Sequence, residues 1–544
     1  MNEMDVEKNL KKLYPSKVVL KRIKVRKSGT IEFLLLVDMV KNVPFQPIAL
    51  VLKRRKSENE EISIAVKSKD SPGQVKVSLD VNDIKWEQFY WDLYLKISID
   101  GAGEYSQRVK IKNKRMMLML KHGFLLNTLN MPNGYILYPY MTAGRELSLT
   151  YRLKSEYESI KYKFNEYVAF ILYKLKKSSQ QNMSIWLIHE KYSETAQDNS
   201  FYFFKYCYEN HKEKKIFFII KKNSVDETYL KPYKDRIVHF MSLKHIKLLL
   251  ESSLIISSEA KGHGYAWRVS QGPIKTYIDK KRFVFLQHGV LGLKIVDKTF
   301  NYGTANSAEL FITSSDFEKE IVKECFGYKD EKVIVTGLSR WDVLSNKANS
   351  ENKQILFMPT WRNWMEEVEQ EDFIKSDYYI AYKSFLSSPE LSNLLEINNI
   401  VLNFYVHPKY MSYIKGLEIN SEHIRVIRYG EEKLNELLMR ANLLITDYSS
   451  VAWEMYYLKK PVIFYFFDLE KYNRYQGSYM DLQKDIFGDT VYNPQDLVDL
   501  LDEYNKSNFT EKPIYSLRRE NYFKFVDRLN SKRIYNEIKR IDNN

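Results

Sequence analysis

The sequence has little cysteine and no long apolar run. Its two cysteines among 544 residues, Cys207 and Cys325, show no CxxC or Cys/His spacing, which argues against a disulfide framework and against a zinc site. No stretch of about 18 apolar residues occurs, so we expect no membrane-spanning segment. The charged residues 1–12 lack the apolar core of a signal peptide. These absences predict a protein of the reducing cytoplasm.

Motifs that mark several enzyme classes are missing as well. There is no Walker A loop and no GxGxxG sequence after a strand, so a kinase-like protein and a dinucleotide-dependent oxidoreductase have no support. No DxD-like pair stands in a metal-binding context, and we predict no metal site and no required cofactor. Zinc-finger spacing and RNP-like aromatic motifs are absent, which argues against nucleic acid as a partner.

What the chain does have is a basic composition rich in aromatic residues. Hydrophobic residues make up 44% and charged residues 28%, as in folded proteins. Lysine and arginine outnumber aspartate and glutamate by 84 to 69, a net charge of +15. This excess suits an anionic membrane face or a polyanionic substrate, and a basic surface that serves only solubility is the alternative. The length predicts about three structural units.

Short β-rich runs separated by turns fill residues 1–153. Their regular spacing predicts a β-sandwich-like N-terminal domain. The clearest runs are 31–37, 47–52, 74–79 and 91–99.

The apolar period becomes helical from residue 155 to 177, inside a connecting segment that we place at 154–183. Such a helix either packs on the next domain or lies on a membrane surface. Residues at spacings of three and four share its apolar face: Tyr157, Ile160, Phe164, Val168, Ile171 and Leu175.

After residue 184, continuous apolar strands alternate with helical stretches, which is typical of buried parallel sheets. The polar stretch 347–353 separates two series, so we predict two Rossmann-like domains, 184–348 and 349–544. Ligands of such sheets bind at the carboxyl ends of the strands. The expected strands are 185–188, 215–220, 237–241, 254–257, 284–287, 310–313 and 333–336, followed by 354–358, 400–406, 424–428, 443–446 and 462–466.

The strongest motif is the turn from Asp447 to Ser450, between an apolar strand and a helix. Ser449 and Ser450 stand at the start of that helix, where unpaired backbone N–H groups and the positive end of the helix dipole attract an anion. We predict that this turn binds the diphosphate of a nucleotide-activated donor, with ordinary N-capping as the alternative. Glu454 follows one turn later, either near a ribose hydroxyl or as a buried capping carboxylate.

A second motif, Gln287-His288-Gly289, ends another strand. Histidine there is a good general base because its ordinary pKa is close to neutrality, and glycine lets the chain turn tightly around it. We predict that His288 is the catalytic base, and a structural histidine is the alternative. Lys294 follows as a candidate contact for the acceptor, or as a surface lysine.

Four weaker candidates also follow strands. His407, which precedes Pro408, is expected to donate to the diphosphate. Arg362 offers a planar fork of donors suited to phosphate, and an interface ion pair is the alternative. Glu190 and Asp198 are candidate contacts for an acceptor hydroxyl, with an Asx-capped turn as the simpler interpretation.

As an ordered set, these motifs resemble the CDP-glycerol glycerophosphotransferase family, the teichoic acid primases and polymerases of Gram-positive bacteria. The resemblance covers about residues 185–519. It rests on Gln287-His288-Gly289, Gly337-Leu338-Ser339-Arg340, Pro359-Thr360-Trp361-Arg362, His407-Pro408, Ile445-Thr446-Asp447-Tyr448-Ser449-Ser450 and Pro461-Val462-Ile463-Phe464-Tyr465.

This resemblance implies a GT-B fold and the transfer of glycerol phosphate or ribitol phosphate from a CDP-polyol to a lipid-linked acceptor, with release of CMP. His288 would be the base, and His407, Arg362, Ser449 and Ser450 would hold the diphosphate. The family's place at the inner face of the cell membrane suits the basic charge. A GT-B glycosyltransferase that uses a nucleotide sugar, or a non-catalytic scaffold for wall or capsule assembly, is the alternative.

Overall fold

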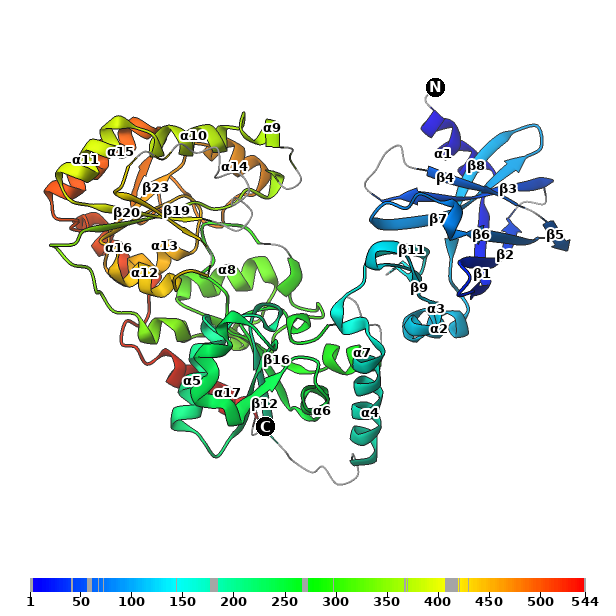
Figure 1. Ribbon diagram of the computed structural model, residues 1–544, viewed down its shortest axis with the longest axis horizontal. Coiled ribbons are helices and arrows are strands. Elements are labelled where there is room, and N and C mark those ends of the chain that lie inside the picture. Colours follow the sequence, from blue (N-terminus) through cyan, green and yellow to red (C-terminus); the bar gives the residue numbers. More distant parts are fainter. Residues whose placement is uncertain are drawn as a thin grey trace. The chain divides into compact units, whose positions relative to one another are not determined.

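The computed structural model contains two compact units, coloured along the chain in Figure 1. The first comprises Met1–Leu175 with Ala266–Tyr277, and the second comprises Lys176–Tyr265 with Ile278–Asn544. The residues that the structure describes are 3–40, 43–55, 61–66, 68–71, 73–142, 144–176, 184–266, 273–296, 298–365, 368, 370–406, 419, 421–428 and 430–542.

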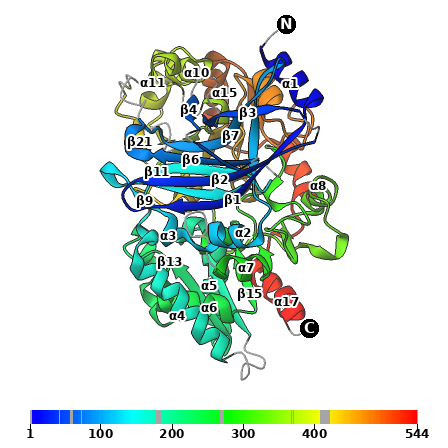
Figure 2. The same cartoon turned by 90° about the vertical axis from the view of Figure 1, so that its right-hand side faces the viewer.

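The first unit is built on one mixed, mainly antiparallel sheet, which Figure 2 shows across its strands. Its order within the described residues is β5-β6-β2-β1-β8-β7-β11-β10-β9, with β3 joined to β7 and β4 joined to β3. The predicted sandwich-like domain is therefore a continuous sheet, in which β1 and β8 pair in parallel. The strands are β1 (Ser16–Val25), β2 (Thr30–Met39), β3 (Phe45–Arg54), β4 (Glu61–Ala65), β5 (Ser68–Ser71), β6 (Gln74–Asp80), β7 (Phe89–Ile99), β8 (Gly103–Lys110), β9 (Leu129–Asn130), β10 (Tyr135–Met141) and β11 (Leu147–Leu153).

Alternate side chains of these strands enclose one hydrophobic core. In β7, for example, Trp91, Leu93 and Leu95 are buried while the residues between them are more exposed, as the pleat of a strand requires. Three helices complete this part of the first unit: α1 (Glu3–Leu13), α2 (Lys114–His122) and α3 (Phe124–Asn127).

The predicted connecting helix is confirmed as α4 (Ile160–Lys176), which belongs to the first unit. Phe170 and Tyr173 meet Tyr277 of α7 (Pro273–Asp279) edge-on. Another face exposes most of the predicted apolar stripe, so the stripe is not the surface by which α4 packs in its own unit. Its members with exposed fractions from 56% to 77% are Ile160, Phe164, Ile171 and Leu175.

The second unit contains two parallel sheets, which confirms the predicted pair of Rossmann-like folds. Their orders are β14-β13-β12-β15-β16-β17-β18 and β21-β20-β19-β22-β23-β24. The strands of the first sheet are β12 (Ile185–His189), β13 (Lys215–Ile220), β14 (Ile237–His239), β15 (Leu254–Ser257), β16 (Arg282–Phe285), β17 (Leu310–Thr313) and β18 (Val333–Val335). Those of the second are β19 (Gln354–Met358), β20 (Val401–Val406), β21 (Ile424–Arg428), β22 (Leu443–Thr446), β23 (Val462–Tyr465) and β24 (Asp489–Val491).

Helices cover both faces of the second sheet, because its strands are apolar on both sides. Leu356 and Leu444 face the core under α12 and α13, whereas Phe357 and Ile445 face the core under α10, α11 and α15. The helices of the second unit are α5 (Asn199–Asn210), α6 (Leu243–Glu251), α8 (Asp316–Phe326), α9 (Gln370–Phe373), α10 (Asp377–Leu386), α11 (Pro389–Ile397), α12 (Leu434–Arg440), α13 (Val451–Tyr457), α14 (Leu469–Tyr475), α15 (Pro494–Lys506), α16 (Pro513–Tyr522) and α17 (Asn530–Asp542).

The last helix, α17, crosses the predicted boundary between the two Rossmann-like domains. Ile534, Tyr535 and Ile538 lie in the hydrophobic core of the first sheet, and Trp186 of β12 donates to Asp542 at 2.9 Å. The C-terminal segment therefore completes the domain that begins at β12. None of the helices in the described part of the chain is long and apolar enough to span a bilayer.

Candidate functional site

Loops at the carboxyl ends of both parallel sheets converge on His288. In each sheet the strand order reverses beside the first strand, at β12 and β19, and such reversals place ligand sites at strand carboxyl ends. Asp198 follows β12, His288 follows β16 and Arg340 follows β18, while Glu454 comes from α13 of the second sheet. Direct contacts join all four side chains.

The imidazole of His288 is oriented by a carboxylate and open to solvent. Its Nδ1 lies 2.8 Å from Asp198 Oδ2 and 3.6 Å from Glu259 Oε1, and its side chain is 64% exposed. Desolvation by the surrounding protein lowers the pKa of His288, but the charges of Asp198 and Glu259 outweigh it and raise this pKa above its ordinary value. With Nδ1 facing Asp198, Nε2 is the nitrogen left to face a substrate.

The backbone before His288 is held in an uncommon conformation. Gln287 has a positive φ of 66°, which L-residues adopt rarely and which here turns the chain out of β16. The side-chain amide of Asn199 donates to the Gln287 carbonyl at 2.7 Å and accepts from the Arg340 N–H at 3.0 Å. Asn199 thus ties the loops after β12, β16 and β18 together.

Asp198 and Glu190 both hold the loop that follows β12. Asp198 caps α5 and binds both His288 and Arg340. Burial would raise the pKa of Asp198, but Arg340 and His288 hold it at about 2, so the side chain is ionised.

Glu190 is buried beside this turn. It accepts from the backbone N–H groups of Gln197, Asp198 and Phe201 and from the Thr195 hydroxyl. Burial, aided by the charge of Asp198, raises the pKa of Glu190 to about 7. As placed, the Glu190 carboxylate positions the turn that carries Asp198, and its contact with an acceptor stays a prediction.

Arg340 connects the two sheets and was not among the predicted site residues. Its Nη1 donates to Asp198 Oδ1 at 2.6 Å and to the His288 carbonyl oxygen. Its Nε and Nη2 donate to Glu454 Oε1 at 2.9 and 2.5 Å. The sequence signals for it were its place just after a strand and its motif Gly337-Leu338-Ser339-Arg340, one of those that carry the family resemblance.

Arg362 and Asp447 belong to a buried ion network. Arg362 donates to Asp447 at 2.7 Å and to both oxygens of Asp468 at 2.8 and 3.0 Å, and its side chain is 1% exposed. The hydroxyls of Tyr382 and Tyr448 donate to these two carboxylates. As placed, both side chains are enclosed and already paired, so neither is free to bind a diphosphate in this structure, and their direct contact with one stays a prediction.

What this network supports is the serine turn. Asp447 accepts from the backbone N–H of Tyr448 at 2.7 Å and of Thr360 at 2.9 Å, which fixes the chain as it leaves β22. Ser449 and Ser450 are half-buried at the start of α13. Within the described residues, no acceptor contacts their backbone N–H groups or that of Val451. These groups remain the candidate anion site.

The serine turn and the base lie close together. A Cβ built on Gly289 would stand 2.5 Å from Ser450 Oγ, so any larger residue after His288 would require the serine turn to shift. Lys294 is half-buried in the same loop, six residues after the base. Glu454, predicted near a ribose hydroxyl, is buried and bound to Arg340. His407 lies outside the described residues.

The described part of the chain contains no group of three or more His, Cys, Asp or Glu side chains that could hold a metal ion.

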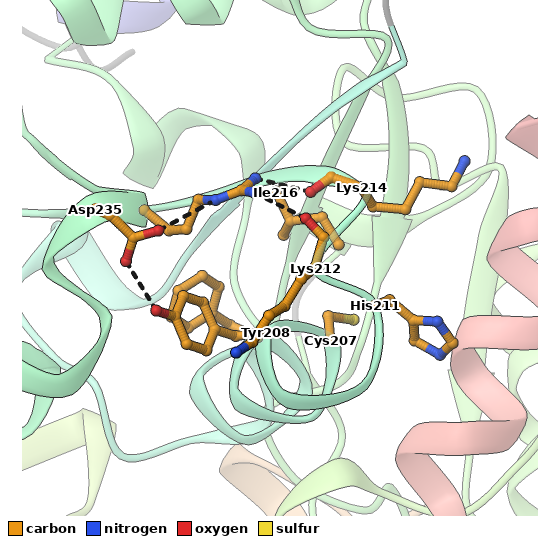
Figure 3. Close-up of a pocket in the computed structure, with 9 residues that line it drawn as sticks. Cys207, Tyr208, His211, Lys212, Lys214, Ile216 and Asp235 are labelled. Atoms are coloured by element: carbon orange, nitrogen blue, oxygen red, sulfur yellow. Dashed lines mark hydrogen bonds and ion pairs between the residues drawn. The ribbon is translucent and has the colours of Figure 1, made fainter.

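A cavity of about 260 Å³ lies at the amino end of β13 (Figure 3). Tyr208 donates to Asp235 at 2.9 Å, and Arg236 donates to the Lys214 and Lys212 carbonyls at 2.7 and 2.9 Å. This cavity lies at the opposite strand ends from His288, so we do not place the reaction there.

The fold and site together define a transferase class in which two parallel-sheet domains meet at a histidine and a helix N-terminus. Residues 170–540 match the family described as CDP-Glycerol:Poly(glycerophosphate) glycerophosphotransferase. The chain belongs to this family.

Relatives agree with this assignment. The chain is 32% identical to the minor teichoic acid biosynthesis protein GgaB of Bacillus subtilis, across 66% of this chain and 40% of that protein. It is 30% identical to the teichoic acid ribitol-phosphate polymerase TarK of Staphylococcus aureus, across 41% of this chain and 44% of that protein. It thus spans less than half the length of these two relatives.

A solved structure shares the fold. A histidine-to-alanine variant of the wall teichoic acid polymerase TagF matches with a TM-score of 0.50 and 16% identity, across 70% of this chain and 98% of that chain. The GT-B-type arrangement of the second unit is thereby confirmed.

Proposed function

We propose that this chain transfers a polyol phosphate, glycerol phosphate or ribitol phosphate, from a CDP-polyol to a hydroxyl of a lipid-linked teichoic acid or capsule-type acceptor. The observation that carries the proposal is the exposed His288 imidazole, oriented by Asp198 and next to the serine turn. Family membership narrows the donor to a CDP-polyol.

In this reaction His288 accepts the proton of the acceptor hydroxyl on Nε2. The acceptor oxygen forms a bond to the phosphorus that carries the polyol. The bond from that phosphorus to the bridging oxygen breaks, and its electron pair leaves with CMP. Asp198 keeps Nδ1 protonated and stabilises the imidazolium that forms.

Negative charge develops on the departing CMP, and the serine turn is the part of the site that stabilises this charge. The N–H groups of Ser449 and Ser450, which no acceptor among the described residues contacts, and the two hydroxyls stabilise the negative oxygens without any rearrangement of solvent. By resemblance to the family, His407 adds a further donor. We propose no metal or cofactor for the step.

A donor screen tests the proposal. The chain is incubated with CDP-glycerol, CDP-ribitol or common nucleotide sugars and a lipid-linked acceptor, and the released nucleotide and the mass added to the acceptor are measured. CMP release with addition of one polyol phosphate is expected. Sugar addition would instead establish a glycosyltransferase, and CDP binding without turnover on any acceptor would establish a scaffold.

We also propose that the exposed stripe of α4 docks on the anionic inner face of the cell membrane, where a lipid-linked acceptor is available. The stripe is apolar, and Lys161, Lys174 and Lys176 on the same helix are exposed. Residues 1–175 contain 31 Lys and Arg against 19 Asp and Glu, so they supply +12 of the +15 net charge. Apolar insertion and charge attraction then act in the same part of the chain.

Vesicle sedimentation tests this docking. Binding to vesicles that contain phosphatidylglycerol is expected to fall on the order of tenfold in Phe164→Glu and Ile171→Glu. Ile397→Glu, at an exposed apolar position of α11, is the matched control and should bind like the wild type. Equal binding by all variants would place the contact elsewhere.

A further inference from the structure

One guanidinium holds both sides of the candidate site. Arg340 binds the carboxylate that orients the base, the backbone carbonyl of the base, and a glutamate of the donor-side helix α13. Glu454 Oε1 also accepts from Trp341 Nε1 at 3.0 Å, whereas Oε2 is buried without a partner within the described residues. The charge of Glu454 is therefore compensated mainly by Arg340.

The geometry points to Arg340 as a positioning residue that couples the donor-side helix α13 to the His288 base. This inference rests on the proposed function. The serine turn begins α13, and Glu454 lies one turn further along the same short helix. A shift of α13 that accompanies donor binding moves Glu454, and through the rigid fork of Arg340 it moves Asp198 and the backbone of His288.

Two parts of this role are separable. The fork shape of Arg340 sets the distances among Asp198, His288 and Glu454, which only a guanidinium can match. Its positive charge opposes protonation of His288 and lowers the pKa of that imidazole, against the raising effect of Asp198. A lysine at 340 keeps the charge and loses the fork, and a glutamine loses both.

The first experiment measures the pKa of His288 directly, without relying on turnover. The full chain is labelled with ¹³C-histidine, the His288 resonance is assigned by its loss in His288→Asn, and the imidazole is titrated in the wild type, Arg340→Lys and Arg340→Gln. The pKa is expected to rise in Arg340→Gln and to stay near the wild-type value in Arg340→Lys.

A matched control separates this effect from the general loss of a buried arginine. Arg519 is also buried, pairs with Glu511 and donates to the Tyr456 carbonyl on α13, away from His288. Arg519→Lys and Arg519→Gln should leave the pKa of His288 unchanged. If Arg340→Gln also leaves it unchanged, Arg340 is only a structural latch and the inference is wrong.

The second experiment uses turnover with the donor identified by the screen. Arg340→Lys is expected to lower kcat on the order of a hundredfold, because His288 is misplaced. The acid limb of the pH–rate profile is expected to stay where it is, because the positive charge near His288 is kept. Glu454→Gln and Arg340→Gln are expected to be non-additive when combined. Additive losses would show that the two residues act separately and would overturn the coupling. A wild type that releases no CMP would defeat the proposed function alone, since the titration still decides the charge effect of Arg340.

Discussion

Arg340 and Arg362 form a natural comparison within the second unit. Each follows a strand of a parallel sheet, and each binds two acidic side chains. Arg362 is 1% exposed, and aromatic rings such as that of Tyr448, 4.8 Å from its guanidinium carbon, surround it. Arg340 also binds the backbone of an exposed histidine, and its partner Asp198 binds the ring.

The difference teaches that an arginine in a family motif does not identify a phosphate site. Two enclosed carboxylates neutralise Arg362, and the guanidinium itself is buried. The cluster around Arg340 ends instead in an imidazole that solvent reaches. Chemistry is expected where a charge network ends at an accessible group.

The largest expected effect is at that accessible group. His288→Asn removes the base and is expected to lower the transfer rate on the order of a thousandfold, with thermal unfolding close to that of the wild type because the ring is exposed. His239→Asn is the control, since His239 also pairs with a carboxylate, Glu227, at 2.7 Å, outside the cluster. A rate within tenfold of the wild type in His288→Asn would remove the proposed mechanism.

The next effect concerns stability and tests the Arg362 side of the comparison. Arg362→Met leaves Asp447 and Asp468 buried without their cation, which is expected to lower the free energy of unfolding by about 3–5 kcal/mol. Urea unfolding measures the loss, and Arg474→Met on the exposed face of α14 is the control. Wild-type stability combined with lost donor binding would instead make Arg362 a phosphate ligand.

Asp198→Asn sharpens the role of the charge on the base. The change removes the negative charge that raises the pKa of His288, so this pKa should fall. The base must be neutral to act, and the rate rises with pH as the imidazole loses its proton. The acid limb of the pH–rate profile is therefore expected to move to lower pH, while the maximal rate drops on the order of a hundredfold through misorientation. An unmoved limb would show that Asp198 does not set this pKa.

Most of the fold of the second unit was predictable because its strands are continuous apolar runs. The expected runs 215–220, 254–257, 310–313, 354–358, 424–428 and 443–446 agree with the observed strands. The expected strand 284–287 ends earlier, at Phe285, because Gln287 takes a positive φ. The short edge strand β24 was missed, since Asp489 and Thr490 give it no apolar run.

The site was predictable only where a residue acts alone. His288 stands out by its own chemistry at a strand end, and Ser449 and Ser450 by their place before a helix. The roles of Asp198, Arg340 and Arg362 depend on partners far along the chain, and Asp468 lies 106 residues after Arg362. A motif does not contain such pairings, so the same residue type was given a phosphate role in one case and left out of the site in the other.

The smallest expected effect tests the close contact between Gly289, next to the base, and Ser450 of the serine turn. In Gly289→Ala the new Cβ would stand 2.5 Å from Ser450 Oγ, so the serine turn must shift. The donor KM is expected to rise about tenfold, with a smaller change in kcat, because one anion-binding residue moves while the base stays in place. Gly144→Ala, where the nearest atom is 3.6 Å away, is the control.

Combining Gly289→Ala with Ser450→Gly removes the clash, so the double variant should bind donor no worse than Ser450→Gly alone. An additive loss would mean that Gly289 acts through its own backbone and not through its contact with the donor turn.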